Sequence, residues 1–158
     1  MELSVMSPVL NQMTLEEALA YLSSLCVDSM EIGAGGYPGK AHLDPKDYLG
    51  NPEKIQELKE LLQKYDLKFS AVACHGNPVH PNQEIAAKFH NEFVDAMKLA
   101  VELGVDTVIG FSGCPGDSDA STNPNWVTCA WPPDYIEILD WQWNEKLIPY
   151  WKEMGKFA

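Results

Sequence analysis

The sequence contains no arginine. All eleven of its basic residues are lysines, and 23 acidic residues give a net charge of -12. Because arginine is the usual clamp for phosphate and carboxylate groups, the composition favours a neutral ligand, unless Lys40 or backbone N–H groups bind an anion. The negative charge also repels a phosphate backbone, so we expect no nucleic-acid partner.

Long apolar runs are also absent, since no stretch approaches the roughly 20 residues that span a bilayer. Residues 1–5 lack the basic region that opens a signal peptide. We therefore expect a cytoplasmic protein with no membrane partner.

The four cysteines are few and widely spaced, with no CxxC pair among them. In a cytoplasmic chain this spacing predicts free thiols and gives no zinc site. Cys26 and Cys74 fit small buried positions, whereas Cys114 and Cys129 fall in a loop.

Short apolar runs and helix-periodic segments alternate along the chain. Strands are expected over 3–6, 29–32, 67–74 and 105–111. Helices are expected over 15–25, from 52 through at least 62, over 85–103 and from about 134 onward. The pair Thr14 and Glu17 has the spacing of a capping box, and Cys26 stands where a glycine would normally end the first helix. This alternation predicts a parallel sheet with right-handed crossovers.

Polar side chains stand at or near the ends of two expected strands. His75 ends the third strand and can bond a sugar hydroxyl or carbonyl, or can simply complete a turn. Glu31 lies in the second strand and can bind hydroxyls or move a proton, or can pair with a buried lysine or amide. Asn77 can orient a hydroxyl, although asparagine before proline is also ordinary turn chemistry. His80 is expected to be structural.

Two loops are expected near these groups. The glycine-rich segment 33–39 lacks the spacing of a nucleotide-binding motif and is interpreted as a flexible loop that approaches a ligand. Residues 112–133 form a loop of a length that is usually functional or disordered. Trp126 and Trp131 in that loop can stack on a sugar or close a pocket, or can merely pack.

Four short motifs occur in order along the chain. They are Glu31-Ile32-Gly33, Cys74-His75-Gly76-Asn77, Phe111-Ser112-Gly113 and Trp141-Gln142-Trp143-Asn144. With this set the chain resembles, over essentially all 158 residues, the N-terminal half of the xylose-isomerase-like TIM barrels, a family of sugar phosphate isomerases and epimerases. The resemblance implies one domain over 1–158, an α/β fold that forms the (βα)4 half of a (β/α)8 TIM barrel, with parallel strands and the helices outside.

The resemblance also implies a chemistry. Family members bind a divalent metal, often manganese, and isomerise or epimerise keto-sugars or related polyols by proton transfer next to a carbonyl. Their metal ligands and their two proton-moving glutamates come from later strands, so no metal ligand is assigned in this chain. The residues carried over are His75 and Glu31 as catalytic groups. Asn77, Ser112, Gly113 and Trp126 are carried over as binding groups for a small carbohydrate.

Other functions remain open. Related barrels perform lyase or dehydratase steps, including cleavage of keto-sugar glycosides, and these reactions begin with the same proton abstraction. The AP-endonuclease branch is disfavoured by the negative charge. A half-barrel can also be a non-catalytic module, and its open strand edges predict a homodimer or a complementing second half-barrel.

Overall fold

The computed structural model describes residues 2–158, which form two compact units. Unit 1 comprises Met1–His75 and Glu92–Gly110, and unit 2 comprises Gly76–Asn91 and Phe111–Ala158. The long helix α4 (Gln83–Leu103) contributes its first part to unit 2 and its second part to unit 1. A single domain over 1–158 stays a prediction.

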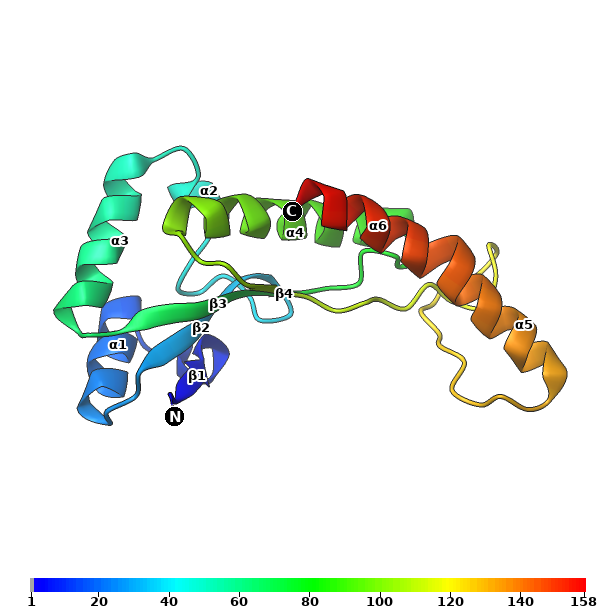
Figure 1. Cartoon of the computed structure of the whole chain (residues 1–158), viewed down its shortest axis with the longest axis horizontal. Helices are drawn as coiled ribbons and strands as arrows, with labels where there is room; N and C mark the ends of the chain where they lie inside the picture. The colour runs from blue at the N-terminus through cyan, green and yellow to red at the C-terminus, as the bar shows by residue number, and fades with distance from the viewer. Residues whose placement is uncertain (1) are drawn as a thin grey trace. The chain divides into compact units, whose positions relative to one another are not determined.

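Unit 1 is built on a parallel four-stranded sheet (Figure 1). Its strands are β1 (Ser4–Met6), β2 (Ser29–Gly36), β3 (Lys68–His75) and β4 (Val108–Ile109), in the spatial order β1-β2-β3-β4. Each strand therefore lies beside its neighbour in the sequence, whereas a doubly wound sheet reverses its strand order at a switch point. The α/β fold predicted from the sequence is confirmed, and this strand order is that of half a TIM barrel.

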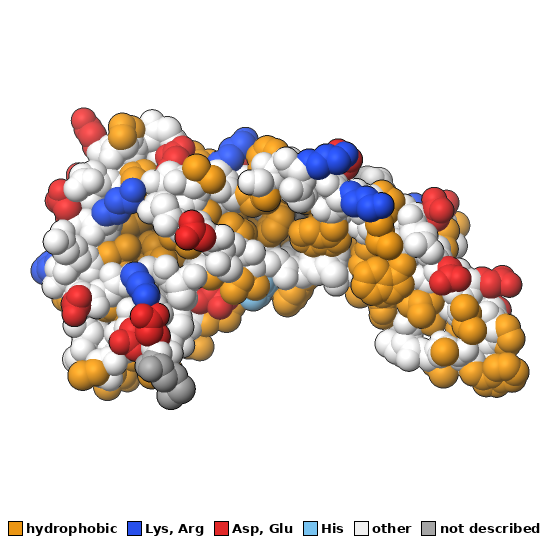
Figure 2. Space-filling view, in the orientation of Figure 1, with side chains coloured by type: hydrophobic (Ala, Val, Ile, Leu, Met, Phe, Trp, Pro, Cys, Tyr) orange, Lys and Arg blue, Asp and Glu red, His pale blue; other side chains and the backbone are white. Residues whose placement is uncertain are grey.

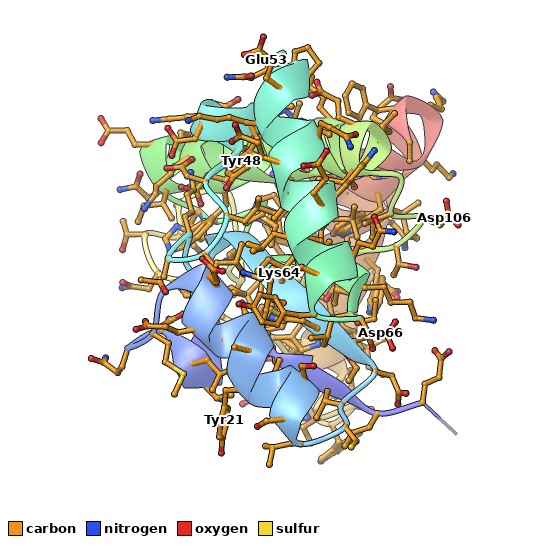
Figure 3. The ribbon with its side chains drawn as sticks, turned by 90° about the vertical axis from the view of Figure 1, so that its left-hand side faces the viewer. Tyr21, Tyr48, Glu53, Lys64, Asp66 and Asp106 are labelled. Atoms are coloured by element: carbon orange, nitrogen blue, oxygen red, sulfur yellow. The ribbon has the colours of Figure 1, made fainter. Side chains whose placement is uncertain are left out.

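Helices α1 (Leu15–Ser24) and α3 (Pro52–Lys64) lie in front of the strands in Figure 3 and so cover one face of the sheet. A short 3-10 helix η1 (Ser7–Leu10) follows β1, and α2 (Pro45–Tyr48) precedes α3. The core between helices and strands is fully apolar at its centre, where Leu19, Met30, Ile32, Val72 and Leu99 are each 0% exposed. The helical spacing of apolar residues in the sequence predicted which face of each helix is buried in this core.

Three helices end in the same backbone turn before the next strand. Cys26, Asp66 and Gly104 adopt the left-handed conformation, with φ of 56°, 53° and 76°. In each turn the next residue donates its N–H to a carbonyl five residues earlier, as Val27 does to Leu22 at 3.1 Å. Cys26, which stands where a glycine was expected to end the helix, adopts the left-handed conformation, and the predicted capping box of Thr14 and Glu17 is confirmed.

Several predicted boundaries were wrong. β2 continues through Gly36, so residues 33–36 are strand and not the flexible loop that we expected. β4 is only two residues long, against the seven expected over 105–111. Cys26 is exposed rather than buried, although Cys74 is buried as predicted, and all four cysteines, which lie within the described residues, are free thiols.

Unit 2 contains the first part of α4, the extended loop 112–132 and a C-terminal helical run. The run consists of α5 (Pro133–Trp141), the π-helix η2 (Gln142–Leu147) and α6 (Ile148–Phe157). The wider π turn ends just before Pro149, whose ring would collide with a preceding carbonyl in a regular α-helix. α5 buries none of its residues, and Figure 2 shows apolar side chains at the surface over it.

No helix among residues 2–158 is both long and apolar enough to cross a bilayer.

Candidate functional site

The sequence-predicted pair of catalytic candidates meets in unit 1. His75 is the last residue of β3, and its Nε2 lies 3.9 Å from Oε1 of Glu31 on β2. Their side chains are 15% and 24% exposed, but the Nε2 atom of His75 is itself buried. A distance of 3.9 Å is too long for a hydrogen bond. It is short enough for one hydroxyl oxygen to bond both atoms.

Strand geometry explains why these two side chains approach each other. Glu31 pairs with Ala71, and alternation then places Ala71, Ala73 and His75 on one face of β3. Since alanine carries only a methyl group, no bulky β3 side chain stands between Glu31 and His75 on that face. A larger residue at position 73 would narrow the space in which the two groups meet.

An irregularity in β2 fixes the backbone beside His75. The pairing of β2 with β3 shifts register between Gly33 and Gly35, and Gly36 then pairs with His75. A Cβ on Gly36 would collide with the His75 carbonyl group, and its φ of 63° also requires glycine. The N–H of Tyr37 donates to the same His75 carbonyl at 2.7 Å. Register shifts of this kind are often found beside active sites.

A carboxylate from α4 completes this corner of unit 1. Glu92 accepts the Gly36 N–H at 2.8 Å through Oε2, and its Oε1 lies 3.5 Å from Nζ of Lys40. Lys40 also lies 3.8 Å from Asp44. Glu92 could not be recognised as a contact residue from the sequence, because an acid within a helical repeat is ordinarily a solvated residue.

The Cys74 thiol lies next to this carboxylate. Burial, and then the negative charge of Glu92, raise the pKa of Cys74 to about 12, partly offset by Lys40. Cys74 therefore stays a neutral thiol at physiological pH and cannot act as a nucleophile there.

The asparagine candidate lies in unit 2 and is bound to the loop that follows β4. Asn77 is 7% exposed. Its Nδ2 donates to the Cys114 carbonyl at 2.8 Å, and its Oδ1 accepts the Cys114 N–H at 2.9 Å. Gly113 fits beside it with a φ of 103°, where a Cβ would lie 2.9 Å from Asn77 Oδ1. Both polar atoms of the Asn77 side chain thus bond the backbone of Cys114, as expected if Asn77 serves only the turn.

The other loop candidates are also held by contacts within unit 2. The Ser112 carbonyl accepts the indole N–H of Trp151 at 2.8 Å. Trp126 packs edge-to-face on Trp143, with ring centroids 5.4 Å apart. His80 accepts the Asn82 N–H through Nδ1 at 2.9 Å, in a turn just before α4.

Gln142 organises the long loop, and the sequence did not single it out for that role. It is 0% exposed. Its amide nitrogen donates to the carbonyls of Gly116 at 2.6 Å and Asn125 at 3.0 Å, and its Oε1 accepts the Val127 N–H at 3.1 Å. A buried glutamine in the π-helix therefore holds the loop segment that carries Trp126.

The described residues do not fit a metal by themselves. Within residues 2–158, His, Cys, Asp and Glu side chains do not gather in groups of three or more that could hold an ion. A zinc site takes at least three such side chains.

Comparison with known proteins agrees with the strand order. The chain belongs to the xylose isomerase-like TIM barrel family, which it matches over residues 19–158. It is also similar to the uncharacterized protein YfiH of Bacillus subtilis strain 168, with 35% identity over 161 residues. That alignment covers 100% of this chain and 51% of YfiH, so the chain spans about half the length of this curated relative.

Proposed function

We propose that this chain provides the substrate-binding half of a barrel that isomerises or epimerises a keto-sugar or a related polyol. The observation that supports the proposal best is the 3.9 Å approach of Glu31, which lies within β2, to His75, which stands at the carboxyl-terminal end of β3. Active sites of such barrels lie at that end of the strands.

In this proposal the two side chains share one substrate hydroxyl next to the carbonyl. The Glu31 carboxylate accepts the hydroxyl proton, and the His75 imidazole donates to the same oxygen or to the carbonyl. Both groups can hold or move a proton during the reaction, and general acid–base catalysis is worth roughly 10²–10⁴-fold in rate. The binding roles expected for Asn77, Ser112, Gly113 and Trp126 stay predictions.

The charge arrangement supports a neutral carbohydrate rather than a phosphorylated one. Lys40, the lysine considered for anion binding, lies within 4 Å of the carboxylates of both Glu92 and Asp44. Its charge is therefore already balanced, and arginine is absent from the chain. A sugar phosphate would have to rely on backbone N–H groups alone.

The divalent metal that the resemblance implies, with manganese as the expected ion, would be held by residues outside this chain. Such a metal supplies charge stabilisation at a carbonyl oxygen when bound. The chemistry assigned here to Glu31 and His75 is limited to binding and proton movement at a hydroxyl.

A complementing partner is part of the proposal. β1 and β4 each pair with one strand only, so the described sheet has two open edges. A second half-barrel, or a second copy of this chain as a homodimer, would cover these edges. Light scattering distinguishes a homodimer from a monomer that needs a separate second half.

The test mixes the chain with the C-terminal half of YfiH and manganese, and then offers a panel of ketopentoses and ketohexoses in D2O. We expect deuterium to enter the carbon next to the carbonyl. Glu31→Gln and His75→Gln should slow this exchange at least 100-fold, the lower end of acid–base contributions. His80→Gln is the matched control, because His80 bonds only a turn amide among the described contacts.

The products decide between reaction classes. An epimer or aldose supports the proposal, whereas an eliminated product would assign the chain to a lyase or dehydratase. Manganese binding to the mixed halves without any hydrogen exchange on the whole panel would contradict catalysis at this site.

A further inference from the structure

Glu92 has no role in the proposed chemistry, yet it is bonded to the backbone that holds His75. Its carboxylate is 17% exposed and accepts the Gly36 N–H at 2.8 Å. Charge-assisted bonds of a carboxylate to a backbone amide are about twice as strong as neutral ones. This bond connects the end of β2 to helix α4 within unit 1.

The end of β2 in turn fixes His75. Gly36 pairs with His75 so closely that a Cβ at position 36 would collide with the His75 carbonyl, and the Tyr37 N–H donates to that carbonyl at 2.7 Å. Gly35 lies against the Cys74 sulfur, since a Cβ there would be 2.8 Å from Sγ and 3.3 Å from the Glu92 Cβ. The backbone at the end of β2 is therefore in close contact with both Glu92 and the end of β3.

We propose that Glu92 is the positioning residue for His75, acting through Gly36 and the Tyr37 amide, and that Lys40 orients the Glu92 carboxylate. Lys40 lies 3.5 Å from Glu92 Oε1, on the opposite carboxylate oxygen from the one that Gly36 uses. The two oxygens therefore have separate partners, which fixes the plane of the carboxylate. The catalytic use of His75 rests on the proposed function, but its positioning by Glu92 does not.

Helix α4 offers a matched control for this contact. Glu102 accepts the Gly50 N–H with both carboxylate oxygens at 3.2 Å, so it makes the same kind of bond from the same helix to a different loop. The Glu102→Ala substitution removes a carboxylate bond to a glycine N–H but leaves the contacts of the β2 end unchanged. Any effect on His75 that is specific to Glu92 should therefore be absent in Glu102→Ala.

The experiment records the ring signals of His75 and the exchange rate of the Tyr37 amide by NMR, in the full chain without any carbohydrate. Glu92→Ala should shift the His75 ring signals and speed exchange of the Tyr37 amide at least tenfold. Glu92→Gln should restore most of both, because its amide oxygen can still accept the Gly36 N–H. Glu102→Ala should leave both unchanged.

Two outcomes would overturn the proposal. The first is a Glu92→Ala protein that is folded but has wild-type His75 signals and Tyr37 exchange. The second is an equal change in Glu102→Ala, which would indicate a general loosening of α4. If His75 moves as expected but the chain binds no carbohydrate, the positioning role stands and the proposed function fails.

Discussion

Unit 1 buries apolar faces of α1, α3 and the second part of α4 against a sheet, whereas α5 in unit 2 buries none of its residues. The loop of unit 2 is instead held by polar side chains. Gln142 and Asn77 each bond backbone atoms through both the nitrogen and the oxygen of the side-chain amide. Unit 1 thus relies chiefly on non-directional burial, whereas the loop of unit 2 relies on directional hydrogen bonds, beside the burial of Leu147 and Met154 in its helices.

This difference has a consequence for substitutions. Loss of a buried apolar side chain removes transfer energy and leaves a cavity, and the cost depends on local packing. Loss of a buried polar side chain leaves its backbone partners unsatisfied, and the cost falls on the segment that they hold. The two units should therefore respond differently to matched changes.

The largest effect is expected in the core of unit 1. Leu19→Ala should lower the free energy of unfolding by about 2–5 kcal/mol, because Leu19 is 0% exposed. Ile136→Ala on α5 is the control and should cost less than about 1 kcal/mol, since Ile136 is 43% exposed. Urea unfolding followed by far-UV circular dichroism measures both. Equal losses would mean that α5 is buried as deeply as α1.

The next effect tests the polar support of unit 2. Gln142→Ala leaves two carbonyls and one N–H without their partner, and should cost about 1–3 kcal/mol. All five tryptophans lie in unit 2, so tryptophan fluorescence during urea unfolding reports on this unit. Asn144→Ala, at an exposed neighbouring position, should leave the transition unchanged. A Gln142→Ala transition that superimposes on the wild type would show that the loop does not need this side chain.

A pH effect follows from the buried thiol in unit 1. Because the pKa of Cys74 is raised to about 12, the folded state keeps a proton that the unfolded chain releases above about pH 8.5. The free energy of unfolding should therefore fall as the pH rises from 8.5 toward 12, by about 1–2 kcal/mol at pH 10.

Cys74→Ala should remove this part of the fall in the free energy of unfolding at alkaline pH. Cys26→Ala, at an exposed position, should leave that fall unchanged. Lysine and tyrosine titrations are common to both variants and cancel in the comparison. Identical alkaline slopes in the two variants would contradict the burial of the Cys74 proton.

The smallest effect concerns the repeated helix ends of unit 1. Cys26→Gly should raise the free energy of unfolding by about 1 kcal/mol, because glycine adopts a φ of 56° without strain. Gly104→Ala should lower it by a similar amount, since a Cβ there meets nothing within 4 Å and only the backbone conformation is strained. Thermal unfolding measures both, and changes of the same sign would refute this account of the turn.

Much of unit 1 could be predicted from the sequence, because periodic apolar positions such as Leu19 and Leu22 mark the buried face of a helix. The close approach of His75 and Glu31 was foreseeable in part, since both residues belong to strands that parallel pairing brings together. The contacts of Glu92 and Gln142 were not foreseeable. Each contact joins residues far apart in the sequence through one side chain, and neither produces a recognisable spacing pattern in the sequence.

The length of β2 escaped prediction for a related reason. Glycines at 33, 35 and 36 are typical of a loop, but here they allow the strand to approach Pro38, Cys74 and His75 closely. Only the neighbours of a glycine reveal whether it provides flexibility or close packing.

Glu31 within β2 and His75 at the end of β3 are proposed to bind a carbohydrate together. The most direct test is an NMR titration of the histidine ring signals of this chain with the panel of keto-sugars. The account predicts a saturable shift of His75 that Glu31→Gln weakens at least tenfold in affinity, while His80 stays unmoved. A His75 signal that no sugar of the panel shifts, or that shifts no more than His80, would contradict it.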